Sequence, residues 1–215
     1  MTTTEYRTLT EDECYNRLRE MIISGTYLPS QRLIEMDLAS AFNVNRASIR
    51  TALARLEQEG LVERERYRGA RVRLVTEGEA IEILEVREVL EGVIARHAAN
   101  QATDEDIHEL RQIVDTMKMY YETNELLRYS EMNSLLHKKI TKIAKHSTAT
   151  KLLDVLNSQN VRFQFRTILA SGRPEKSFAE HNAIVEAIAN GDAQAAENAM
   201  RVHLSHVTEA LRQIT

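Results

Sequence analysis

Both prolines of this 215-residue chain lie between segments of helical periodicity, so no predicted helix is interrupted. Pro29 falls in a turn-rich connector, and Pro174 falls in the break Ser171-Gly172-Arg173-Pro174. No run of about 18 apolar residues occurs, so no membrane span is predicted. Beyond residue 76 the periodicity predicts an all-α bundle of six helices, over residues 78–100, 104–121, 125–145, 148–170, 176–190 and 193–213.

The first 75 residues have a different pattern, with three shorter helices predicted over residues 11–24, 35–42 and 46–59. Thr10 and Glu13 form a capping box that starts the first helix. Asn43 is expected to take a left-handed conformation in a tight turn between the second and third helices, because asparagine tolerates positive φ.

Two short strands follow, over residues 61–66 and 70–74, and Arg68-Gly69 joins them. The second strand alternates apolar and charged residues, which is typical of a half-buried strand. Three helices with a tight turn and then a hairpin predict a winged helix-turn-helix. The predicted fold is therefore mainly α, with a winged helix-turn-helix at residues 1–75 and an all-helical bundle at residues 76–215.

Positive charge is concentrated in the predicted DNA-binding part. Residues 1–75 carry a net charge of +1 and the remaining residues −5, and the segment 46–73 holds eight arginines against four glutamates. A basic segment of this kind is typical of phosphate binding. Arg46 and Arg50 share one face of the third helix, and arginine, serine and asparagine side chains can contact bases or phosphates. The alternative is that these arginines only solvate a helix.

The residues of this N-terminal part resemble the GntR superfamily of transcriptional regulators. The similarity begins in the first helix with Tyr15-Asn16-Arg17-Leu18-Arg19 and continues through Leu38-Ala39, Ile49-Arg50, Arg55-Leu56-Glu57 and Glu59-Gly60-Leu61-Val62. Ser30 and Asn43 replace glycines that are usual in the family, and Ala47 and Ser48 replace a frequent Thr-Pro. The resemblance implies that the DNA-contacting residues are Asn45, Arg46, Ser48, Arg50, Arg68 and Gly69.

Three histidines in the C-terminal part lie on apolar helical stripes. His137, His181 and His203 each belong to a different predicted helix and are expected to point into the bundle. Imidazoles from facing helices can bind one divalent ion in a bundle core. The alternative is that the three are hydrogen-bonded core residues. If His203 points away, His206 is the reserve ligand.

The same segments resemble FCD, the effector domain of the FadR subfamily. The similarity includes Glu85-Val86-Arg87, Leu136-His137, Ser177–His181 and Ala199–Leu204, and it extends over most of residues 78–207. Many FCD domains bind a divalent metal through three histidines and an aspartate four residues before the first. Asn133 replaces that aspartate here, and a neutral amide is a weaker ligand than a carboxylate. The resemblance implies that residues 76–215 form an effector-binding and dimerisation domain. It also implies a zinc or nickel site at Asn133, His137, His181 and His203.

Arg87 is a candidate anchor for a carboxylate effector if it faces the cavity. The alternative is a surface ion pair with Glu91, four residues later. Glu180 directly precedes a histidine of the cluster and is expected to face elsewhere on its helix.

Together these features predict a homodimeric, cytoplasmic transcriptional regulator, with a repressor favoured over an activator. Its partners would be double-stranded operator DNA and a small organic acid, and no membrane. The single Cys14 excludes an internal disulfide and fits a reducing compartment. Two alternatives stay open, namely a regulator with structural histidines and no metal, and a metal-dependent hydrolase. The second is disfavoured because no general base is predicted beside the histidines.

Overall fold

The computed structural model describes residues 9–65, 69–168, 170 and 172–214, with the backbone alone at residues 65, 160–162 and 164–166. The chain divides into two compact units, Met1–Val75 and Thr76–Thr215. Each unit has its own hydrophobic core among its described residues.

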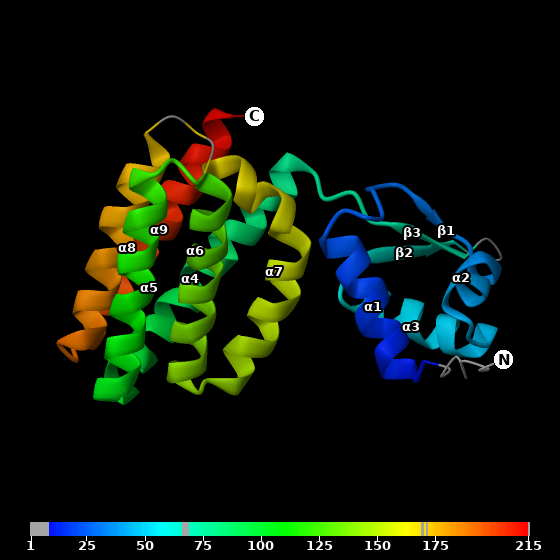
Figure 1. Cartoon of the computed structure of the whole chain (residues 1–215), viewed down its shortest axis with the longest axis horizontal. Helices are drawn as coiled ribbons and strands as arrows, with labels where there is room; N and C mark the ends of the chain where they lie inside the picture. The colour runs from blue at the N-terminus through cyan, green and yellow to red at the C-terminus, as the bar shows by residue number, and fades with distance from the viewer. Residues whose placement is uncertain (1–8, 66–68, 169, 171, 215) are drawn as a thin grey trace, which may run out of the picture. The chain divides into compact units, whose positions relative to one another are not determined.

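The first unit is a winged helix-turn-helix, as predicted (Figure 1). Its strands form an antiparallel sheet in the order β1-β3-β2. The two-residue strand β1 was not predicted, because two residues are too few to show an alternation. The elements of this unit are α1 (Glu11–Ile23), β1 (Arg32–Leu33), α2 (Glu35–Phe42), α3 (Arg46–Gln58), β2 (Val62–Glu65) and β3 (Gly69–Val72).

Local residue chemistry determines how α2 and α3 meet. Asn43 ends α2 with φ 52° and ψ 49°, which confirms the predicted left-handed turn. Helix α3 then buries Ile49, Leu53 and Leu56 completely or almost completely in the core of the unit. Because these residues repeat at helical spacing, the opposite face of α3 is left at the surface.

Gly69 begins β3 with φ +88°, a conformation that favours glycine. A Cβ atom at this position would lie 2.7 Å from the carbonyl oxygen of Leu33 in β1. Any larger residue would therefore force the two strands apart, since β1 pairs directly with β3 through Leu33 and Ala70.

All the regular secondary structure in the described part of the second unit is α-helical (Figure 1). Helix α8 begins three residues before the predicted start, because Pro174 occupies its first turn, where a missing N–H costs nothing. No helix within the described residues is both long enough and apolar enough to cross a membrane. The helices are α4 (Glu77–Gln101), α5 (Asp104–Glu122), α6 (Leu126–Ala144), α7 (Ser147–Ile168), α8 (Arg173–Ala189) and α9 (Ala193–Gln213).

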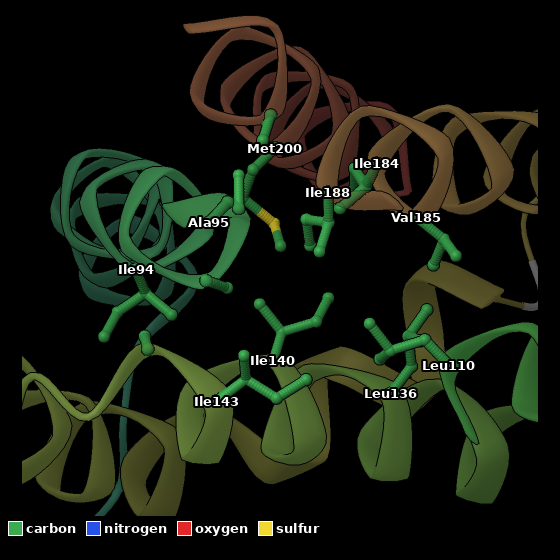
Figure 2. Close-up of a cluster of buried hydrophobic side chains, with 14 of the residues drawn as sticks. Ile94, Ala95, Leu110, Leu136, Ile140, Ile143, Ile184, Val185, Ile188 and Met200 are labelled. Carbon is green, nitrogen blue, oxygen red and sulfur yellow. The ribbon is translucent and has the colours of Figure 1, made fainter. Parts of the chain in front are cut away.

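Helix α4 packs against α6, α7, α8 and α9. Figure 2 shows the core between them, with Ala95 from α4, Ile140 from α6, Ile188 from α8 and Met200 from α9 directed into one space. Residues of this core flank each cluster histidine along its own helix. The packing of the core therefore determines where the histidine side chains meet.

Candidate nucleic-acid interface and candidate metal centre

The start of α3 is held by a side-chain cap. The backbone N–H of Ser48 donates a 2.9 Å hydrogen bond to Oδ1 of Asn45, which precedes the first residue of the helix. The hydroxyl of Ser48 donates to the same oxygen over 3.3 Å. This cap satisfies a backbone donor that the first turn of a helix otherwise leaves without a partner.

Two of the predicted DNA-contacting residues project from this helix into solvent. The side chains of Arg46 and Arg50 are 59% and 57% exposed, and both guanidinium groups contact Oε2 of Glu35, at 3.4 and 2.8 Å. Burial raises the pKa of Glu35, but the hydrogen bonds from Arg50 and Arg46 outweigh it, so the net shift is downward. Glu35 at the start of α2 therefore carries a negative charge that holds both arginines.

The other predicted DNA contacts have different surroundings. Asn45 is exposed, whereas Ser48 is only 7% exposed and takes part in the cap. Gly69 is required by its positive φ and its close approach to the Leu33 carbonyl, whether or not it contacts DNA. Arg68 lies outside the described residues. The DNA contacts of these residues stay predictions, and Arg46 and Arg50 are the cationic groups that the described part of the site presents.

The three histidines of the second unit come together, each from a different helix. The candidate ligand nitrogens of His137, His181 and His203 all lie within 4.8 Å of one another. Nε2 of His137 lies 3.3 Å from Nε2 of His181, and His181 is fully buried. In a tetrahedral zinc site with bonds of about 2.1 Å, two ligand nitrogens are separated by about 3.4 Å. The spacing between His137 and His181 fits this geometry.

A polar partner contacts Nδ1 of each histidine. Oε2 of Glu91 lies 2.6 Å from Nδ1 of His137, and the hydroxyl of Ser177 lies 3.3 Å from Nδ1 of His181. With Nδ1–H donating to these oxygens, Nε2 keeps its lone pair, which is the state that binds a metal.

Nδ1 of His203 has the same kind of contact, because Oε2 of Glu180 lies 2.7 Å from it. The guanidinium of Arg173 donates a 2.8 Å hydrogen bond to the same carboxylate oxygen. The other oxygen of Glu180 contacts Nδ1 of His206 at 2.8 Å. Glu180 therefore faces the cluster and not away from it, so the expectation for this residue was wrong.

Asn133 lies one helical turn before His137 and is buried. Its Oδ1 atom is buried and has no hydrogen-bond partner among the described residues. A buried oxygen without a partner costs free energy unless a ligand satisfies it. Three imidazole nitrogens and one amide oxygen form a donor set that suits zinc or nickel, so the residues fit a divalent metal.

Burial keeps His181 and His203 neutral. It lowers the pKa of both His181 and His203 well below the ordinary value of 6.5, and repulsion from neighbouring histidines and Arg173 adds to this effect. Neutral imidazole is the form that binds metal. His203 points inward and is buried, whereas the side chain of His206 is 48% exposed, so His206 is not needed as a ligand in place of His203.

Arg87 is buried and not at the surface. Its Nε and Nη2 atoms donate hydrogen bonds of 2.9 and 2.7 Å to Oε1 of Glu91. The ion pair between Arg87 and Glu91, the alternative to effector binding, therefore exists, but it is buried and not at the surface. An effector carboxylate would have to compete with Glu91 for this guanidinium.

The sequence did not point to Glu91, Glu180 or Arg173 as neighbours of the histidines. Ser177 had a local signal, because it lies four residues before His181 on one helix face. Arg173 lies seven residues, or two helical turns, before Glu180 on α8, so its contact with Glu180 is local to that helix. Arg173 reaches His203 only through the packing of α8 against α9.

The comparisons with known proteins agree with both halves of the structure. Residues 10–72 match the family "Bacterial regulatory proteins, gntR family", and residues 82–206 match the FCD domain. The HTH-type transcriptional repressor RspR of Escherichia coli K12 is 27% identical over 202 residues, which cover 94% of this chain and 89% of RspR.

Two solved structures show the same fold at low sequence identity. E. coli McbR/YncC superposes with a TM-score of 0.77 at 18% identity, over 95% of this chain and 97% of that one. A putative GntR transcriptional regulator from Rhodococcus sp. RHA1 gives 0.72 at 20% identity, over 95% and 98%. The chain therefore belongs to the gntR family of bacterial regulatory proteins, as a DNA-binding transcriptional regulator with an FCD domain and not an enzyme.

Proposed function

We propose that this regulator represses transcription by binding operator DNA as a homodimer, and that a small organic acid bound in the helical unit changes its affinity for DNA. Each protomer would place α3 in the major groove of one half-site of a roughly palindromic operator. The observation that carries the DNA contact is the exposed pair Arg46 and Arg50 at the start of a helix whose other face is buried. Gly69 and Arg68 at the wing would approach the DNA backbone.

The proposed contacts divide into two kinds. Arginine recognises guanine through paired hydrogen bonds to its major-groove edge, or it binds phosphate without sequence preference. Asn45 and Ser48 would contribute at the same end of α3. Since phosphate contacts release counterions, DNA affinity is expected to fall steeply with rising salt concentration.

DNA binding is tested with a duplex selected by the protein from a random 30-bp pool. Arg46→Ala or Arg50→Ala is expected to weaken binding by about 1–3 kcal/mol at fixed salt. Arg111→Ala is the matched control, because Arg111 is an exposed arginine of the helical unit, where it pairs with Glu186 of the same unit. Binding that is unchanged in both arginine variants, or equally weakened in the control, would contradict the assignment.

In the helical unit, we propose that His137, His181, His203 and Asn133 hold a divalent metal ion, zinc or nickel. When bound, the ion would supply a Lewis-acidic contact for a carboxylate oxygen of the effector. The residues of the chain would orient the imidazoles and exclude water from the cluster. Support comes from the nitrogen spacing and from the buried Oδ1 of Asn133 that lacks a partner in the described structure.

An effector acts on DNA binding only if it prefers one arrangement of the two DNA-binding units over another. The coupling would be measured as the change in operator affinity when a candidate organic acid is added. Arg87 is the proposed carboxylate anchor, in competition with Glu91.

The metal is tested by elemental analysis of protein purified without an affinity tag. Close to one equivalent per chain is expected in the unaltered protein, and a large loss is expected in His181→Ala. Because His181 is fully buried, a thermal melt must show that the variant is folded. Almost no metal in the unaltered protein, with no stabilisation by added zinc, would favour the second candidate, a regulator with structural histidines.

A further inference from the structure

We propose that Glu91 and Glu180, each paired with a buried arginine, are positioning residues that set the tautomers of His137 and His203. The inference rests on the proposed function for the metal, but the orientation of the histidines can be tested without one. The carboxylates belong to α4 and α8, whereas the histidines that they contact belong to α6 and α9. Two unrelated helix pairs therefore repeat one arrangement, in which an arginine, a glutamate and a histidine are connected in that order.

On the α4 side, the two carboxylate oxygens of Glu91 contact different residues. Oε1 accepts both hydrogen bonds from Arg87, at 2.9 and 2.7 Å, and Oε2 contacts Nδ1 of His137 at 2.6 Å. The side chains of Arg87 and Glu91 are 9% and 5% exposed. A buried pair in this geometry is rigid, because moving either member would leave a charge in the interior without compensation.

On the α8 side, Oε2 of Glu180 accepts from Arg173 at 2.8 Å and contacts Nδ1 of His203 at 2.7 Å. Arg173 and His203 are both buried. The remaining oxygen of Glu180 contacts the exposed His206. Glu180 therefore resembles Glu91 in presenting a carboxylate oxygen to Nδ1 of a histidine. It differs in that one oxygen serves both the arginine and the histidine, and Nη2 of Arg173 also lies 3.4 Å from Nδ1 of His203.

A neutral imidazole carries its proton on either Nδ1 or Nε2. A carboxylate beside Nδ1 can only accept, so it requires the proton at Nδ1 and leaves the Nε2 lone pair available. The arginine compensates the carboxylate charge, which makes the burial of the anion tolerable. At His181 the atom beside Nδ1 is the Ser177 hydroxyl, 3.3 Å away, which can donate or accept and therefore does not select a tautomer.

If the Arg–Glu pairs served packing alone, replacing a carboxylate would change stability but not the tautomer of the neighbouring imidazole. Glu→Gln separates the two roles. A glutamine amide is nearly the same size but can present either its oxygen or its NH2 group to Nδ1, so it removes the preference for one tautomer. The matched controls are Glu186→Gln on α8 and Glu88→Gln on α4, whose carboxylates pair with Arg111 and Arg201 away from the cluster.

The first measurement is long-range ¹H–¹⁵N NMR on metal-free, histidine-labelled full-length protein. In the unaltered protein, His137 and His203 are expected to carry the proton on Nδ1. Glu180→Gln is expected to give a mixture of tautomers at His203, and Glu91→Gln a mixture at His137, while both controls keep the original signals. Nε2–H signals at either histidine in the unaltered protein, or unaltered signals in both glutamine variants, would overturn the inference.

The second measurement is Zn²⁺ affinity, determined by competition with a chromophoric chelator. Loss of such an outer partner typically weakens metal binding by 10–100-fold. This loss is expected in Glu180→Gln and not in Glu186→Gln. If Glu91→Gln does not fold, the double variant Arg87→Met/Glu91→Leu removes the buried pair as a unit and takes its place.

The two measurements separate the failure of this inference from the failure of the metal site. If the unaltered protein binds no zinc but shows the Nδ1–H tautomers, the proposed metal site is wrong and the positioning role of the glutamates stands. If zinc binds equally well with and without the Glu180 carboxylate, the positioning role is wrong and the proposed metal site stands.

Discussion

Arg50 donates a 2.8 Å hydrogen bond from its Nε atom to Oε2 of Glu35, so the exposed face of α3 is tied to the first turn of α2. The guanidinium of Arg46 contacts the same oxygen at 3.4 Å. Glu35 therefore limits the conformations of both arginines before any DNA arrives. The two arginine side chains are therefore partly ordered before DNA binds, which reduces the conformational entropy that binding would cost.

Glu35→Gln is expected to separate affinity from specificity. Removing the negative charge should strengthen binding to a random 30-bp duplex, because net positive charge on the DNA-facing side increases. The looser arginines should discriminate less, so the preference for the selected duplex over the random one should fall by about fivefold, or ~1 kcal/mol. Fluorescence anisotropy at fixed salt measures both affinities. Asp37→Asn makes the same charge change on α2, and identical behaviour of the two variants would contradict a positioning role for Glu35.

Asn45→Asp is expected to leave protein stability nearly unchanged and to weaken DNA binding. Aspartate caps a helix as well as asparagine does, and its charge is favourable at a helix N-terminus. The same charge would repel phosphates if Asn45 faces DNA as proposed. Asn45→Ala should instead lower the free energy of unfolding by about 1 kcal/mol, because the acceptor for the Ser48 N–H is lost. Chemical denaturation and DNA titration together measure the two effects, and undiminished DNA binding by Asn45→Asp would remove this residue from the interface.

Asn133→Asp is expected to make the protein more dependent on metal. Without metal, a buried carboxylate replaces the amide whose oxygen lacks a partner in the described structure, so the melting temperature should fall. With zinc, the negative ligand should raise affinity by about tenfold, equivalent to about 1.4 kcal/mol. The measurement is the rise in melting temperature on adding zinc, which should be larger in the variant. An equal rise in both proteins would place residue 133 outside the metal site.

Lys145→Gly is expected to stabilise the protein. Lys145 ends α6 with φ 50° and ψ 28°, a left-handed conformation that costs most residues about 1–2 kcal/mol. Part of this gain is lost because glycine makes the unfolded chain more flexible, so a net increase of about 0.5–1 kcal/mol in the free energy of unfolding remains. Lys142→Gly, in the last turn of the same helix, should destabilise by about 1 kcal/mol. Denaturant unfolding that shows a loss in both variants would contradict the argument.

Asp106→Asn is expected to reduce the dependence of the free energy of unfolding on pH in the acidic range. Hydrogen bonds from Lys139 and from Thr103, which caps α5, lower the pKa of Asp106 to about 2, below the ordinary value of 3.8. A lowered pKa means that the carboxylate stabilises the fold above about pH 4 and loses this effect as the pH falls through about 2. The variant should lose about 1 kcal/mol at pH 7, and the difference should vanish at the acid end. Urea titrations between pH 2 and 7 measure this, with Asp104→Asn as the control; a difference that persists at pH 2 would exclude ionisation as the cause.

The sequence alone determined the secondary structure and the fold of both units. The capping box at Thr10, the left-handed turn at Asn43 and the apolar repeat are local features that act within one helix or at its end. The same repeat predicted that His137, His181 and His203 point inward. The start of α8 was predicted three residues late, because it depends on a proline tolerated in a first turn. Strand β1 was not predicted, because it depends on pairing with a distant strand.

Only the tertiary structure decided what surrounds the histidines. Glu91 and His137 are 46 residues apart, and Glu180 and His203 are 23 apart, so no pattern within one helix connects them. Glu180 was expected to face away because adjacent helical residues point about 100° apart. Helix α9 packs along α8, and its His203 lies beside that second face. The direction in which a side chain leaves its helix follows from the sequence, but the partner that it meets follows from the packing of the helices.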